Sequence, residues 1–368
     1  MNFKSIVDKI EYILCPIVLF LLALNFLLFS FFDYLLLKNV IRLSIVLLLG
    51  LMLAVQLYKK SFKQTHIVLF FISLFLFLID SSLAYNLLFL SLLVLAFHTV
   101  EDRYFYKTAF LISALLTVVV LFCLLVGWQS PWVYTDPDTL RTRNTLGFTN
   151  VNSASIFFFS LMSSFLFAPK KVTFWHLGAV TVGSVVLFII TDSRTPLLGM
   201  LLLISIYLLL PRIPEKWSLG CFYTGIILLF ATAFLWALPF VNTPIINSLL
   251  SERPRHFIGY IQQQNIWSVF IGGSNTPEID NLYLLLLYNV GIFLYSFICW
   301  ILLKAGRQLI KSGRYLEISF VTSMLICGVF EATLLRPELF CAPLFWVICS
   351  RDMLNQGKPL LFEAKRCE

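Results

Sequence analysis

Long apolar segments recur along the whole chain and alternate with short polar ones. About 20 apolar residues cross a bilayer, and a backbone in hydrocarbon must satisfy its own hydrogen bonds, so these segments predict membrane-spanning helices. We place twelve spans at about residues 13–32, 40–57, 66–80, 83–98, 108–127, 150–168, 174–191, 196–210, 219–238, 282–303, 316–335 and 338–350. The chain is therefore expected to be an all-α polytopic membrane protein, with residues 1–368 in one membrane domain.

Two connecting segments are longer than the others, at residues 128–149 and 239–281. Neither is large enough to form a domain with its own core. Irregular backbone beside a membrane commonly lines a site, so we expect the active face in these two loops. The second loop also predicts a short amphipathic helix, with Phe257, Ile258 and Ile261 facing the membrane.

Composition agrees with a membrane protein, since 60% of the residues are hydrophobic and 12% are charged. A soluble domain carries about twice that share of charge. The eight cysteines form no CxxC pair and mostly fall in apolar segments, where they are expected to be packing residues. No cluster has metal-ligand spacing, and we expect neither a metal nor a cofactor.

The positive charges predict the topology. If the N-terminus is cytoplasmic, 19 of the 27 lysines and arginines fall on inward segments and eight on outward ones. The positive-inside rule therefore predicts that both termini are cytoplasmic. This distribution explains the net charge of +8 without nucleic acid.

The outward cations differ in type from the inward ones. Lysine predominates inside, whereas seven of the eight outward cations are arginines, namely Arg42, Arg141, Arg143, Arg194, Arg253, Arg255 and Arg336. Arginine binds phosphate with two parallel hydrogen bonds, so this bias favours a phosphorylated ligand on the outer face. Pairing with outer acids or lipid headgroups is the alternative.

Polar residues in the second loop and near the last spans are further candidates. His256 is a candidate base or plain polar surface, and Asp280 is either a helix N-cap or a carboxylate beside a phosphate site. Glu331 sits inside the apolar span at 316–335, so it is expected to be paired, with Arg336 as the simplest partner, or to line a cavity.

A set of motifs in fixed order resembles bacterial O-antigen polymerases and ligases. The motifs are Gly147-x-x-Asn150-x-Asn152-x-Ala154, Ser193-Arg194, an outward arginine, Gly272-Gly273 and Asp280-Asn281-x-Tyr283-Leu284 followed by Gly291. They cover residues from about 140 to 295. The resemblance implies an inner-membrane glycosyltransferase that moves a growing glycan from undecaprenyl diphosphate onto a lipid-linked repeat unit.

The resemblance implies roles for the candidate residues. Diphosphates are expected at Arg141, Arg143, Arg194, Arg253 and Arg255. Catalytic candidates are Asp280, Glu252 and His256, and substrate-binding candidates are Asn150, Asn152, Asn281, Tyr283, Glu331 and Arg336. The expected partners are the lipid-linked donor and acceptor, membrane lipids and a chain-length regulator protein.

One departure from the family separates polymerase from ligase. Ligases carry a histidine immediately before the Asn-x-Tyr-Leu pattern, and this chain has Asp280 there. The departure favours a polymerase that lengthens O-antigen or a related surface polysaccharide. A ligase of the same family, or a flippase or transporter of lipid-linked sugars, is the alternative. Transporters commonly show internal repeats and midplane binding residues, which are not visible here.

Overall fold

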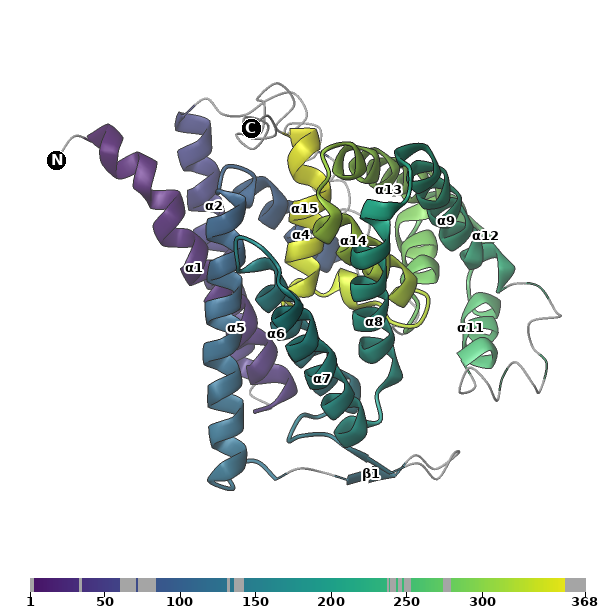
Figure 1. Cartoon of the computed structure of the whole chain (residues 1–368), viewed down its shortest axis with the longest axis horizontal. Helices are drawn as coiled ribbons and strands as arrows, with labels where there is room; N and C mark the ends of the chain where they lie inside the picture. Colours follow the sequence, from purple (N-terminus) through teal and green to yellow (C-terminus); the bar gives the residue numbers. More distant parts are fainter. Residues whose placement is uncertain are drawn as a thin grey trace.

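The computed structural model describes residues 3–32, 35–59, 71, 84–130, 133–135, 142–236, 238, 243, 247, 253–273 and 279–354. Within these ranges the protein is almost entirely helical (Figure 1). The helices are α1 (Phe3–Ser30), α2 (Leu35–Tyr58), α4 (Ala84–Phe97), α5 (Asp102–Leu125), α6 (Val151–Phe167), α7 (Phe174–Thr191), α8 (Arg194–Leu209), η1 (Leu210–Arg212), α9 (Glu215–Leu235), α11 (Arg253–Gln262), α12 (Ile266–Ile271), α13 (Leu282–Lys311), α14 (Tyr315–Cys327), η3 (Thr333–Leu335) and α15 (Cys341–Leu354).

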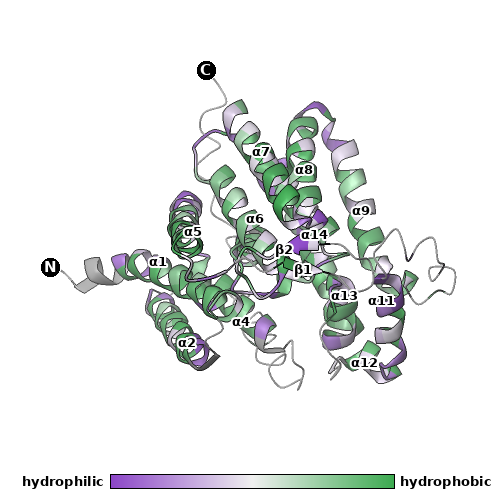
Figure 2. Cartoon of the chain, turned by 90° about the horizontal axis from the view of Figure 1, so that it is seen from below, coloured by the Kyte–Doolittle hydropathy of each residue, from purple (hydrophilic) through white to green (hydrophobic). Residues whose placement is uncertain are grey.

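The all-α membrane architecture expected from the sequence is confirmed in its coarse form. Among the described residues, α1, α2, α5, α7, α9 and α13, and α8 together with η1, are long and apolar enough to cross a membrane. Four predicted spans form shorter apolar helices, at Asn86–Phe97, Val151–Phe167, Tyr315–Cys327 and Cys341–Arg351. The predicted span at 66–80 lies outside the described residues apart from Phe71. Figure 2 shows hydrophobic residues along most of the helices and more hydrophilic ones on α11.

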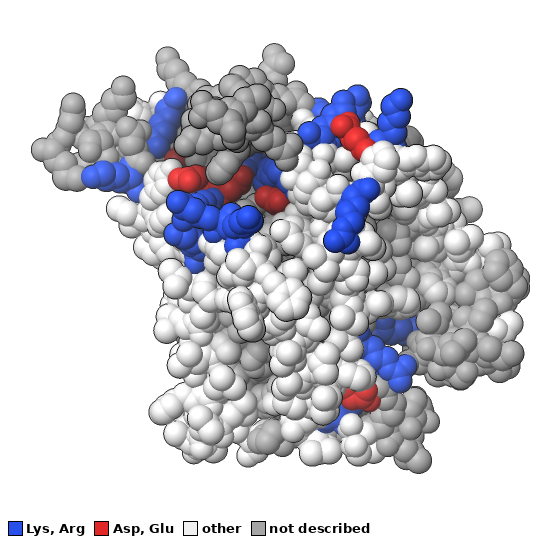
Figure 3. Space-filling view, in the orientation of Figure 1, with Lys and Arg blue, Asp and Glu red and all other residues white. Residues whose placement is uncertain are grey.

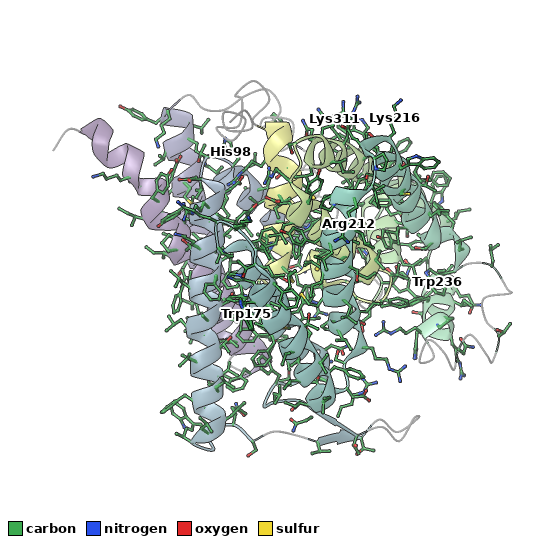
Figure 4. All side chains as sticks on the ribbon, in the orientation of Figure 1. His98, Trp175, Arg212, Lys216, Trp236 and Lys311 are labelled. Atoms are coloured by element: carbon green, nitrogen blue, oxygen red, sulfur yellow. The ribbon has the colours of Figure 1, made fainter. Side chains whose placement is uncertain are left out.

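Lysines and arginines lie at two levels of the molecule, separated by a largely uncharged band (Figure 3). Lys216 and Lys311, which the topology prediction assigns to the cytoplasmic side, lie at one edge, and Arg212 lies below them in the same half (Figure 4). Helix α1 begins and α15 ends near that edge, whereas the β-hairpin lies at the opposite one (Figure 1). The charge pattern is that of a bundle with two polar ends.

The serine-rich helix α6 shows how polar side chains are tolerated in the apolar bundle. Ser160, Ser163 and Ser164 are buried, and each donates a hydrogen bond to the carbonyl four residues earlier in the helix. These small hydroxyls are satisfied locally and leave room for neighbouring helices to approach. The buried cysteines Cys15 and Cys341 likewise act as packing residues, as predicted.

The first long loop contains a β-hairpin that the hydrophobic pattern does not predict. Strands β1 (Val133–Thr135) and β2 (Thr142–Asn144) pair antiparallel, with Tyr134 opposite Arg143. The loop is tied to the end of α1, because the Gln129 side chain donates to the Phe31 carbonyl at 2.6 Å. A three-residue strand is too short to show an alternating pattern that would predict it.

The prediction of one span over residues 316–335 is wrong at its end, since α14 ends at Cys327. The reason lies in α13. The Leu282 backbone N–H donates to the Gly328 carbonyl at 2.8 Å, and the Asn281 side chain donates to the Val329 carbonyl at 2.8 Å. Because these carbonyls are satisfied by the start of another helix, the chain can leave the helical path here and carry Glu331 out of α14.

Candidate functional site

A pocket of about 700 Å³ opens beside α11, the segment that enters α13, and the segment that follows η3. Its lining residues are Arg253, Arg255, His256, Phe257, Gly259, Tyr260, Gln263, Ile279, Asp280 and Arg336. Helix α11 lies at the lower right of Figure 1, and basic atoms gather near this level in Figure 3. Five candidate residues from three distant parts of the sequence thus share one cavity. Three of them are arginines, so the cavity favours anions.

Helix α11 buries Phe257 against the protein, which corrects the prediction that this side chain lies against the membrane, whereas Ile258 and Ile261 are half-buried. Phe257 is 1% exposed and meets the Trp236 ring edge to face, with 4.9 Å between centroids. Trp236 follows α9 and lies beside α11 (Figure 4). Tyr260 packs in the same way on Tyr288 of α13, at 5.9 Å. These aromatic contacts fix the helix that carries three of the candidate charges.

The N-cap of α13 is Asn281 and not Asp280. The Asn281 side chain is fully buried, accepts a hydrogen bond from the Leu284 N–H at 2.9 Å and donates one to the Val329 carbonyl. Capping therefore does not occupy Asp280, which is exposed and lines the pocket. Of the two interpretations of Asp280, the structure excludes the cap and leaves a carboxylate beside the arginines.

Glu331 pairs with Arg253, whereas Arg336 was the simplest partner expected from sequence. The Arg253 Nη2 atom lies 3.3 Å from Glu331 Oε1, and its Nη1 donates to the Phe330 carbonyl at 2.7 Å. The guanidinium carbon also lies 5.6 Å from the centre of the Phe330 ring. Phe330 and Glu331, in the segment after α14, thereby hold the side chain of Arg253, which lines the pocket.

Burial raises the pKa of Glu331 to about 7, and the negative charge of Asp280 contributes to this rise. The charges of Arg253 and Arg336, and the hydrogen bond from Arg253, oppose it. A carboxyl group that changes charge near neutral pH therefore lies next to the arginines of the pocket.

Other candidates lie away from this pocket. Arg143 is half-buried in β2, and Arg194 is exposed at the first residue of α8. Asn150 caps α6, because its side chain accepts a hydrogen bond from the Asn152 N–H at 2.7 Å. Tyr283 is fully buried and donates to the Leu325 carbonyl at 2.6 Å. The structure thus gives Asn150, Asn281 and Tyr283 structural contacts.

Two candidates, Arg141 and Glu252, lie outside the described residues. Sequence reasoning also missed contributors to the pocket. Gln263 and Tyr260 line it from α11, and Phe330 supplies the carbonyl and ring that hold Arg253. The sequence signal for Gln263 is its place in the polar run from Gln262 to Asn265. The hydrogen bond from Arg253 to Phe330 ends on a backbone carbonyl, which leaves no mark on the sequence.

The pocket combines an anion-binding wall with a carboxylate, which are the parts that a group transfer from a phosphate leaving group requires. Arg255 and His256 belong to the first turn of α11, where free backbone N–H groups also favour anions. In the described parts of the chain, no group of three or more His, Cys, Asp and Glu side chains could hold a metal ion. No protein-family model, curated protein or solved structure matches this chain.

Proposed function

We propose that the chain is a polymerase of O-antigen or a related surface polysaccharide. The observation that carries the proposal is the pocket in which Arg253, Arg255 and Arg336 face Asp280. In the proposed reaction, a hydroxyl at the non-reducing end of a lipid-linked repeat unit attacks the anomeric carbon of the growing glycan. The bond between that carbon and undecaprenyl diphosphate breaks, and the hydroxyl proton leaves.

The arginines have a defined role in this reaction. Negative charge develops on the departing diphosphate, and preorganised guanidinium groups stabilise it without rearranging. Arg253 is preorganised by Glu331 and the Phe330 carbonyl. Arg141, Arg143 and Arg194 are proposed to hold a second lipid diphosphate, that of the acceptor.

Asp280 is proposed to accept the proton of the acceptor hydroxyl. Its exposure and its freedom from helix capping support this role. His256 lines the same pocket and is the second candidate base, and Glu252 is a third from the sequence. Asn152 is proposed to contact sugar.

The proposed topology has twelve spans, both termini in the cytoplasm and the two long loops at the periplasmic face of the inner membrane. The positions of Lys216 and Lys311 at one edge, away from α11, support it (Figure 4). In this arrangement the pocket opens where flipped lipid-linked substrates are present.

The test is deletion of the gene followed by electrophoresis of the lipopolysaccharide. We expect the ladder of long chains to collapse to core plus one repeat unit, and the wild-type gene to restore it. A full ladder in the deletion strain would refute the proposal. Bare core would indicate a ligase. If the purified protein moved lipid-linked sugar across vesicles without lengthening it, the chain would be a flippase.

A further inference from the structure

Glu331 lies behind the pocket, where it contacts Arg253, one of the residues that line it. The residue is 6% exposed, and its Oε1 atom holds the Arg253 guanidinium at 3.3 Å. The other terminal nitrogen of Arg253 donates to the Phe330 carbonyl. Arg253 thus connects a buried carboxyl group on one side with the open cavity on the other.

Four charged or titratable groups lie close enough to Glu331 to interact with it electrostatically. Arg253 comes from α11, Asp280 from the segment before α13, and Arg336 from the segment after η3. The Cys327 thiol at the end of α14 is also near. An anion bound in the pocket would add a negative charge next to Arg253.

We propose that Glu331 is a positioning residue that couples the binding of a phosphate-ester anion in the pocket to the uptake of one proton from solvent. This inference rests on the proposed function and deepens it. When Glu331 is ionised, it competes with the ligand for the Arg253 guanidinium. When Glu331 takes up a proton, the full charge of Arg253 becomes available to the anion, while the Phe330 carbonyl still fixes the guanidinium in place.

The direction of the coupling follows from electrostatics. A second negative charge beside Glu331 disfavours its ionised form, so binding raises the pKa of this carboxyl further. Because the pKa is already about 7 in the empty site, the proton is taken up in the neutral range. Affinity for the anion is therefore highest at acid pH and falls as the pH rises through 7.

The test measures binding of UDP-glucose to the full chain in detergent micelles by titration calorimetry. Both phosphates of this probe are esterified, so its own charge stays constant over the pH range used. We expect affinity to fall about tenfold between about pH 6 and pH 8.5, the change produced by a pKa rise of about one unit. Titration in two buffers with different ionisation enthalpies should show net proton uptake near pH 7.

Two variants test whether Glu331 is the group that takes up the proton. Glu331→Gln mimics the protonated side chain, so it should bind at every pH about as tightly as the wild type does in acid. His256→Gln removes the histidine that lines the pocket and should keep the pH dependence. The inference is overturned if Glu331→Gln keeps the wild-type pH dependence, or if His256→Gln abolishes it.

The proton measurement on the wild-type protein needs no variant, so the test does not depend on whether Glu331→Gln folds. Binding without proton uptake overturns the coupling alone and leaves the pocket as an anion site. Absence of binding at every pH overturns the coupling together with the assignment of this pocket to diphosphate.

Discussion

The backbones of Gly272 and Gly291 meet without room for a side chain on either residue. A Cβ atom on Gly272 would lie 2.4 Å from the Asn289 carbonyl oxygen, and one on Gly291 would lie 2.5 Å from the Phe270 carbonyl oxygen. Both glycines have positive φ, and Gly291 interrupts α13 with a non-helical φ of 75°. The contact fixes α12 against the break in α13, next to the segment that carries α11 and the pocket.

This contact predicts that Gly291→Ala destabilises the protein. At Gly291 φ is 75° and ψ is 164°, a conformation that is open almost only to glycine and costs an alanine about 1–3 kcal/mol. Displacing the facing carbonyl adds to that, so we expect a loss of about 2 kcal/mol or more. Thermal unfolding in detergent measures it. Gly225→Ala is the matched control, because a Cβ there meets nothing within 4 Å and the residue lies inside α9. Equal melting temperatures for the two variants would contradict the prediction.

Asp280 and Asn281 are adjacent, but substitution of Asn281 should lower stability, whereas substitution of Asp280 should lower activity. Asn281→Ala removes the cap of α13 and the bond to the Val329 carbonyl, so stability should fall by about 2 kcal/mol. Asp280→Asn should fold like the wild type, because the side chain is exposed. If the carboxylate accepts the proton of the acceptor hydroxyl, the variant should lose glycan lengthening. Unfolding curves and the lipopolysaccharide ladder together separate the two effects. A normal ladder with Asp280→Asn would exclude this residue as the base.

Arg194→Lys keeps the positive charge at the start of α8 but loses the planar fork that binds phosphate with two hydrogen bonds. If Arg194 holds a diphosphate, polymerase activity should fall about tenfold or more while expression stays normal. The polymer should then be shorter. Arg212→Lys is the control, because Arg212 is also exposed but lies beyond the opposite end of α8. Unchanged chain length with Arg194→Lys would mean that this arginine is structural.

Protein stability should depend on pH through Glu331. The pKa of this group is raised from 4.5 to about 7 in the folded protein, so the folded state binds more protons than the unfolded state between these values. The stability contribution is complete below pH 4.5 and is lost as the pH rises through 7. The full effect is about 3 kcal/mol at most. Melting temperatures from acid to neutral pH should fall more for the wild type than for Glu331→Gln, and parallel curves would contradict this.

The pocket could be predicted only in part. Residue types identified Arg253, Arg255, Asp280 and Arg336 as candidates, because arginines and a carboxylate near hydrocarbon are costly to keep without a role. Their meeting in one cavity could not be predicted, since sequence separation does not report the distance between side chains. The roles of Asp280 and Asn281 were also undecided, because either residue type can cap a helix.

By itself the sequence determined that the chain is a bundle of apolar helices in a membrane, because the length and hydropathy of a span are local properties. Only the tertiary structure decided where α14 ends, which surface α11 packs on and which partner Glu331 has. Each of these depends on a backbone carbonyl or an aromatic ring that is brought in from a distant segment. The carbonyls of Gly328 and Phe330 are invisible in a residue pattern, yet they end one helix and hold the arginine that faces the pocket.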